Sequence, residues 1–141
     1  MPKKPIDVLF LFEKQARELD VLCLLKVFLE RKKLTVEIIQ QNTQAYFAIR
    51  NFQPKVVVLP FCYQNRSNNI YFRFWRSATY ISLNWEQFFY PGNKIAKTPR
   101  GQFATKRVIH CSWSDDYTKL LKGCGVPQSN IRLIGSLPLG L

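Results

Sequence analysis

The sequence is poor in the residues that build metal centres and cross-links. It has one histidine, His110, and four cysteines that are scattered along 141 residues without a Cys-x-x-Cys pair. A zinc site needs several such ligands at short spacing. We therefore expect no metal site, no other cofactor, and reduced thiols that are mostly buried.

Long hydrophobic runs and a signal peptide are absent as well. Lys26 interrupts the most apolar segment, which falls short of the roughly 20 residues that a bilayer-spanning helix needs. The basic first residues lead through a short apolar stretch into Glu13 and Lys14, unlike the start of a secreted protein. We therefore expect a cytoplasmic protein.

Glycine is scarce too, with six residues in the chain. No Gly-x-Gly-x-x-Gly follows the first apolar run, and this disfavours dinucleotide binding in its usual mode. The chain also lacks internal repeats and low-complexity segments. Its length predicts one domain over residues 1–135, and the Gly and Pro near the end predict that 136–141 begin an interdomain linker.

Acidic residues are few, because nine Asp and Glu face 21 Lys and Arg and leave a formal net charge of +12. Such a charge fits three partners: nucleic acid, an anionic membrane leaflet and phosphorylated substrates. Aromatic and basic residues are mixed over residues 71–76, and more of them follow at 88–90 and Lys94. For this mixture we favour a core role for the rings over a membrane surface, and a membrane surface over nucleic acid.

The apolar residues that are present form short continuous runs separated by helical patterns. The runs predict strands at 8–12, 35–39, 56–59, 80–85, 108–112 and 130–134. Helices are predicted at 16–33, 44–52 and 70–76, with a fourth capped by Ser114. Continuous apolar strands are typical of parallel sheets that are buried on both faces. The sequence therefore predicts an α/β fold with a doubly wound, mostly parallel, Rossmann-like sheet of about six strands.

Two segments of this pattern are unusual. The helix at 16–33 is apolar on nearly every side except at Lys26 and Glu30, so we expect it to be buried by two flanking helices or by a second domain outside this chain. The region 86–107 has no clear period, and we interpret it either as a functional loop or as the site of an undetected short helix.

Candidate functional residues follow the predicted strands. Glu13 comes after the first strand, residues 60–63 after the third, Glu86 after the fourth and Trp113–Ser114 after the fifth. All should therefore lie at the carboxyl-terminal edge of the sheet. Glu13 and Glu86 are candidates for a general base. Alternatively, Glu13 is a helix-start carboxylate paired with Arg17, which itself could instead bind a phosphate. His110 could also act as a base, although a strand histidine hydrogen-bonded to its neighbours explains it better.

Two stretches resemble the N-terminal half of GT-B glycosyltransferases that build bacterial surface polysaccharides such as capsule and O-antigen. The first, residues 9–20, contains an acidic residue after a strand and then Arg-Glu-Leu-Asp. The second, residues 112–136, contains a Gly-Val-Pro turn between a helix and a strand that ends in Gly. The sequence Asn-Trp-Glu-Gln at 84–87 falls where such proteins place an acidic motif. Residues 31–33 lack the family's glycine turn, and 135–137 lack its Pro-Arg continuation.

The resemblance implies an acceptor-side domain that is inactive by itself. A second, C-terminal domain would bring the nucleotide-sugar donor. A lipid-linked saccharide at the inner face of the plasma membrane, an anionic surface, would be the acceptor. The alternatives are a non-catalytic Rossmann-like module that binds a nucleotide or RNA, and half of a sugar-nucleotide epimerase. We expect Glu13 and Glu86 to be catalytic, and the substrate-binding residues to be Arg17, Trp85, Gln87, His110, Trp113 and Ser114.

Overall fold

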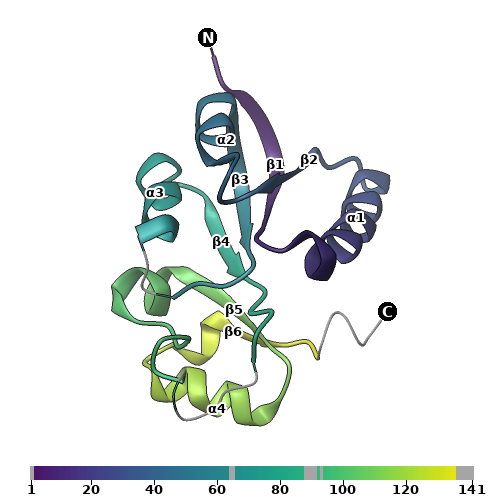
Figure 1. The fold of residues 1–141 in the computed structure, drawn as a ribbon. Helices are drawn as coiled ribbons and strands as arrows, with labels where there is room; N and C mark the ends of the chain where they lie inside the picture. The colour runs from purple at the N-terminus through teal and green to yellow at the C-terminus, as the bar shows by residue number, and fades with distance from the viewer. Residues whose placement is uncertain (1, 64–65, 88–91, 93, 136–141) are drawn as a thin grey trace.

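Six parallel strands form a single sheet in the computed structural model, which describes residues 2–63, 66–87, 92 and 94–135 (Figure 1). The order across the sheet is β2-β1-β3-β4-β5-β6. The predicted α/β, Rossmann-like fold is therefore confirmed. The strands are β1 (Lys4–Phe12), β2 (Val36–Gln40), β3 (Phe52–Leu59), β4 (Thr79–Ser82), β5 (Val108–Ser112) and β6 (Ile131–Leu133).

The first strand lies inside the sheet, between β2 and β3. Val8 is level with Val36 on one side and with Val56 on the other. The chain builds the sheet in one direction from β1 to β2, then crosses back over β1 and builds in the other direction from β3 onward. This reversal of direction is the switch point, beside which doubly wound sheets bind ligands at the carboxyl ends of their strands.

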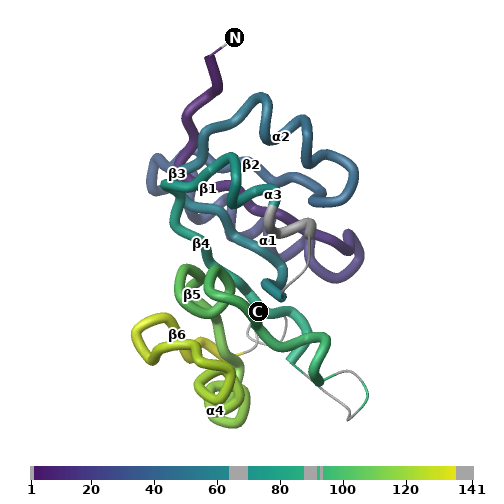
Figure 2. The backbone as a smooth tube through the Cα atoms, turned by 90° about the vertical axis from the view of Figure 1, so that its left-hand side faces the viewer, coloured from purple at the N-terminus to yellow at the C-terminus, as the bar shows by residue number. Residues whose placement is uncertain are grey.

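Helices cover both faces of the sheet. In Figure 1, α1 (Gln15–Arg31) lies on one side and α2 (Ala45–Asn51) and α3 (Arg66–Phe74) on the other. Successive residues of β1 point to opposite faces, so Leu9 packs in the α2–α3 core and Phe10 in the α1 core. Figure 2 shows α4 (Asp115–Gly123) beside β6 at the far end of the molecule, where Leu121 and Ile131 share a small core.

The first helix is buried along one stripe only. Glu18, Val21 and Leu22 face the sheet, whereas Val27 and Phe28 are 46% and 52% exposed. The expectation that two other helices flank α1 is therefore wrong, because its main packing partners are β1 and β2. Burial by a second domain stays a prediction. Within the ranges given above, no helix combines the length and apolarity that crossing a bilayer requires.

Several boundaries differ from the predicted ones. β1 and β3 start four residues early, at Lys4 and Phe52, and these two residues pair with each other. The first four positions of each strand include polar residues and a proline, so the apolar pattern did not indicate that the strands begin there. β4 ends at Ser82, and Asn84 then adopts a left-handed backbone with φ of 51°, which is incompatible with an extended strand.

The region without a clear period contains a short helix. Its last five residues, Phe103–Arg107, form one π-helical turn directly before β5. Phe103 packs against Phe72 and Tyr80, so this turn covers the α3 side of the sheet. The alternative of an undetected short helix is thus confirmed for the end of the region. The predicted linker, 136–141, lies outside the described residues.

Candidate functional site

The carboxyl ends of β1, β3 and β4 meet beside the switch point. The backbone N–H of Leu83 donates to Leu59 O at 2.9 Å, and that of Trp85 donates to Pro60 O at 3.1 Å. These bonds continue the β3–β4 pairing beyond the two strands. Glu86 is thereby brought alongside the segment 60–63, and Glu13 follows the neighbouring strand β1.

Arg17 links these strand ends to the first turn of α1. Its Nη1 donates to Glu86 Oε1 at 2.8 Å, and its Nε and Nη2 donate to Glu18 Oε1 at 3.0 and 2.5 Å. Glu13 Oε2 is farther away, 3.7 Å from Arg17 Nη2. The structure therefore brings together the predicted residues Glu13, Arg17 and Glu86. With Glu18 and Lys97, described next, they form the strand-end cluster.

Glu18 is a buried carboxylate that the sequence analysis did not select. Its side chain is inaccessible to solvent, and Oε2 accepts a 2.8 Å hydrogen bond from the backbone N–H of Glu13. Burying a charged carboxylate is energetically unfavourable unless the group is paired with a cation and hydrogen-bonded. Glu18 thus fixes both Arg17 and the backbone after β1. The available signal was its spacing, which places it on the same helical stripe as Val21 and Leu22.

Lys97 reaches the cluster from the long segment between β4 and β5. Its ammonium group contacts Glu86 Oε2, so Glu86 bridges two cations. The hydrogen bond from Lys97, aided by that from Arg17, lowers the pKa of Glu86, although partial burial opposes the shift. Two cations therefore hold Glu86 as an anion, whereas the Glu13 carboxylate forms one ion pair within the described ranges, the longer contact with Arg17.

Two aromatic residues at this edge carry polar atoms without a hydrogen-bond partner among the described residues. The Tyr63 ring stacks on Phe61 at 4.9 Å, and its hydroxyl is buried. Burial raises the pKa of this phenol, and the negative charge of Glu86 adds to the shift. Trp85 is 4% exposed, and its indole Nε1 is likewise unpartnered.

Gln87 and Trp113 connect the end of β4 to the end of β5. Gln87 Oε1 accepts from the Trp113 backbone N–H at 2.8 Å, and Gln87 Nε2 donates to Cys111 O at 3.2 Å. The structure therefore brings these two predicted residues together. They form a second group on the same edge of the sheet, and Gln87 directly follows Glu86 in the chain.

His110 lies in the core and contacts neither Arg17 nor Glu86. Its Nε2 lies 2.7 Å from Ala104 O, and its Nδ1 lies 3.3 Å from Asn84 Nδ2. A carbonyl oxygen can only accept, so these partners assign the proton to Nε2 and make Nδ1 an acceptor. Burial lowers the pKa of His110, so the ring is neutral at physiological pH. This geometry matches the interpretation of a strand histidine satisfied by its neighbours.

Ser114 caps α4, as the sequence predicted. Its Oγ accepts a 3.2 Å hydrogen bond from the backbone N–H of Tyr117, and Asp115 and Asp116 follow in the first turn. A serine at this position satisfies one of the otherwise unpaired N–H groups of the helix start. The contact accounts for Ser114 structurally, and its role in substrate binding stays a prediction.

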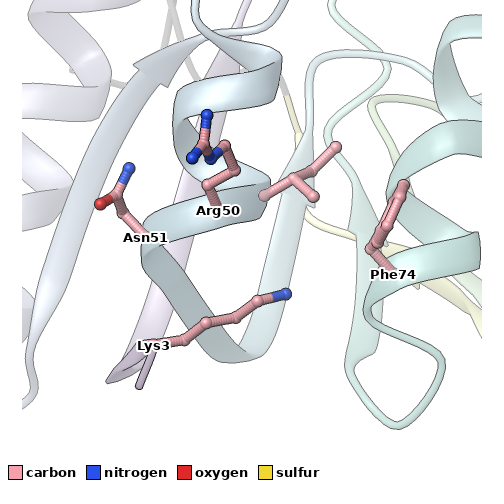
Figure 3. A pocket seen from close by; sticks show the side chains of 5 residues that line it. Lys3, Arg50, Asn51 and Phe74 are labelled. Carbon is pink, nitrogen blue, oxygen red and sulfur yellow. The ribbon is translucent and has the colours of Figure 1, made fainter. Parts of the chain in front are cut away.

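A separate pocket of about 450 Å³ opens at the opposite, amino-terminal edge of the sheet. Ile49, Arg50 and Asn51 line it from the end of α2, Lys3 lines it from the residue before β1, and Phe74 lines it from the end of α3. In Figure 3 the Lys3 side chain extends toward Phe74, and its Nζ lies 5.9 Å from the ring centroid. Helix C-termini attract cations, so Lys3 suits this place as a structural residue.

Metal ligands do not gather anywhere in the described ranges: no group of three or more His, Cys, Asp or Glu side chains is placed to hold an ion. The four cysteines are free thiols, and Cys62 and Cys111 are buried. Comparisons with protein-family models, with curated proteins and with solved structures found no match to this chain.

Proposed function

We propose that this protein is the acceptor-side domain of a GT-B-type glycosyltransferase that extends a bacterial surface polysaccharide. The observation that supports this most is the contact between Arg17 and Glu86 at the strand ends beside the switch point. The two residues come from separate stretches that resemble the family, 9–20 and 84–87. Their meeting at the edge where doubly wound sheets bind ligands is what a shared site requires.

Glu13 is the better candidate for the general base. In an inverting transfer, a carboxylate takes the proton of the acceptor hydroxyl while the oxygen attacks the sugar carbon and the nucleotide leaves. Efficient bases have a pKa near the working pH. Two cationic partners lower the pKa of Glu86, which makes that carboxylate a poor base. Glu86 then serves to hold Arg17 and Lys97 in place beside Glu13.

In this proposal the donor and the acceptor approach from outside the chain. A nucleotide sugar is brought by a second domain, and a lipid-linked saccharide is presented at the inner face of the membrane. The net charge of +12 supports peripheral association with an anionic leaflet. The substitution Glu13→Gln tests the assignment in the complete protein that contains this chain, with labelled nucleotide sugars and a lipid-linked acceptor.

We expect Glu13→Gln to lower kcat by about 10²-fold or more, because a positioned general base contributes roughly 10²–10⁴-fold. The melting temperature should stay unchanged, since the one ion pair of the Glu13 carboxylate among the described residues is a long contact of 3.7 Å with Arg17. Glu37→Gln is the matched control, because Glu37 on β2 pairs with Lys4 at the start of β1 and lies away from the cluster. Turnover within threefold of the wild-type value in Glu13→Gln would rule out Glu13 as the base.

A non-catalytic module that binds a nucleotide or RNA is the second candidate. The observation that favours it is that Glu86 is already neutralised by Arg17 and Lys97, as in a purely structural ion-pair network. Under this alternative, no donor supports transfer. Filter binding should then retain a labelled nucleotide or RNA, with an affinity that falls steeply as salt increases.

A further inference from the structure

Several buried polar atoms at the carboxyl-terminal edge lack a hydrogen-bond partner within the part of the chain that the structure describes. They are Gln41 Oε1 after β2, Tyr63 Oη after β3 and Trp85 Nε1 after β4. Native proteins rarely leave such atoms unsatisfied, and each exception calls for an explanation such as a ligand or an ordered water. The three atoms follow β2 and β3, which flank β1, and β4, which pairs with β3, at the end of the sheet where Glu13 lies.

Comparable groups elsewhere in the core are satisfied. Tyr80 Oη donates to Trp75 O at 3.1 Å, and Trp75 Nε1 donates to Phe52 O at 3.0 Å. Tyr71 Oη donates to Gln41 O at 2.7 Å. These three core phenol and indole groups therefore have acceptors, whereas the Tyr63 hydroxyl at the strand ends has none among the described residues.

The surroundings of Tyr63 select the chemistry of a ligand. Its hydroxyl lies within the electrostatic influence of Glu86, Arg17 and Glu13, yet hydrogen-bonds to none of them. The strand-end cluster holds both carboxylates and cations, so a free anion or a free cation would meet like charge there. A neutral hydroxyl meets neither difficulty, because it can accept from a phenol and donate to a carboxylate at the same time.

We propose that Tyr63 binds a saccharide at the strand-end cluster by donating a hydrogen bond from Oη to one of its hydroxyls. The same saccharide hydroxyl, or its neighbour, donates to a carboxylate of Glu13 or Glu86. Tyr63 suits this role because its stacking on Phe61 fixes the ring before the ligand arrives, which reduces the entropy lost on binding. The inference rests on the proposed function for its choice of saccharide, and it adds Tyr63 as an acceptor-binding residue.

The substitution Tyr63→Phe tests this assignment, with methyl β-D-glucoside, methyl β-D-galactoside and methyl N-acetyl-β-D-glucosaminide as probes. Saturation-transfer NMR measures their binding to the protein. For at least one of the probes we expect affinity to fall fivefold or more in the variant. We also expect its melting temperature to be unchanged or higher, because the lost hydroxyl has no internal partner.

Tyr80→Phe is the matched control. It removes a hydroxyl that donates to Trp75 O, so it should lower the melting temperature and leave glycoside binding unchanged. Equal glycoside affinity in Tyr63→Phe and wild type would overturn the proposal and assign the hydroxyl to a water. A melting temperature lowered as much as in Tyr80→Phe would overturn it too, and so would a wild-type protein that binds none of the three glycosides.

The two proposals fail in different ways. If Glu13→Gln keeps its turnover while Tyr63→Phe loses glycoside binding, the saccharide site stands and the catalytic base does not. If Glu13→Gln abolishes turnover while Tyr63→Phe keeps both its affinity and its kcat/KM, the glycosyltransferase stands and the role of Tyr63 does not.

Discussion

At the scale of single residues, His110 makes stability depend on pH. Burial lowers the pKa of its imidazole in the folded state, whereas the unfolded chain takes up the proton near pH 6.5. Between these two values the unfolded state binds more protons, so stability falls as the pH decreases below about 6.5. For one such group the loss is at most about 1.4 kcal/mol per pH unit. Urea unfolding at pH 7.5, 6.5 and 5.5 measures it.

The effect can be assigned to one residue because His110 is the sole histidine. The pKa of Asp7 is lowered to about 2 and that of Glu86 is lowered as well, so both carboxylates titrate below this pH range. The variant His110→Gln should show a flat profile from pH 7.5 to 5.5, whatever its absolute stability. A sloping profile in His110→Gln, or a flat one in the wild type, would contradict this account.

The common direction of the parallel strands made part of the site predictable. Glu13 and Glu86 follow strands, and parallel strands end at one edge, so their proximity could be inferred before any contact was seen. The position of Lys97 could not be predicted, because its segment has no hydrophobic periodicity that would indicate a helix or a strand. Tyr63 also follows a strand, but whether its hydroxyl has a partner depends on atoms from several distant segments. Glu18 was predictable only from its place in an apolar stripe.

At the scale of elements, α4 depends on its cap. Ser114→Ala removes the acceptor for the Tyr117 N–H and should lower the free energy of unfolding by about 1 kcal/mol. Ser114→Asp should retain most of that stability, because aspartate caps as well as serine and favours the positive helix start. Chemical denaturation compares the variants. Equal stability of Ser114→Ala and wild type would show that the cap contributes little.

The elements themselves were predicted better than their surroundings. Continuous apolar runs indicated all six strands, because burial on both faces removes the need for polar residues. For α1, the apolar surface led to a wrong prediction, namely that two other helices flank it. A helix wheel shows which side chains are apolar, but Val27 and Phe28 are left exposed because the sheet meets only the stripe of Val21 and Leu22. A helical wheel gives no information on how many elements pack against the helix.

At the scale of the whole molecule, the net charge of +12 should make stability rise with salt. Like charges repel more strongly in the compact state than in the expanded one, and salt screens them over a Debye length of about 10 Å at 0.1 M. Exposed ion pairs such as Lys4–Glu37 oppose the effect only weakly. We expect the melting temperature to increase by a few degrees between 20 and 300 mM NaCl.

Lys94→Glu provides the control for this charge effect, because it lowers the net charge by two at an exposed position. Its melting temperature should rise less with salt than that of the wild type. Differential scanning calorimetry measures both proteins. A melting temperature that falls as NaCl is added would show that attractive pairs outweigh the excess of positive charge.

The central position of β1 also affects how the chain is made. The ribosome synthesises β1 before both of its neighbours. Val8 cannot pair with Val36 on one edge or with Val56 on the other until β2 and β3 have been made. Until then its apolar residues present two open backbone edges to the cell, which favours aggregation and chaperone capture. Slower translation of the stretch between β2 and β3 would prolong that exposure, so codon choice there should influence the yield of folded protein.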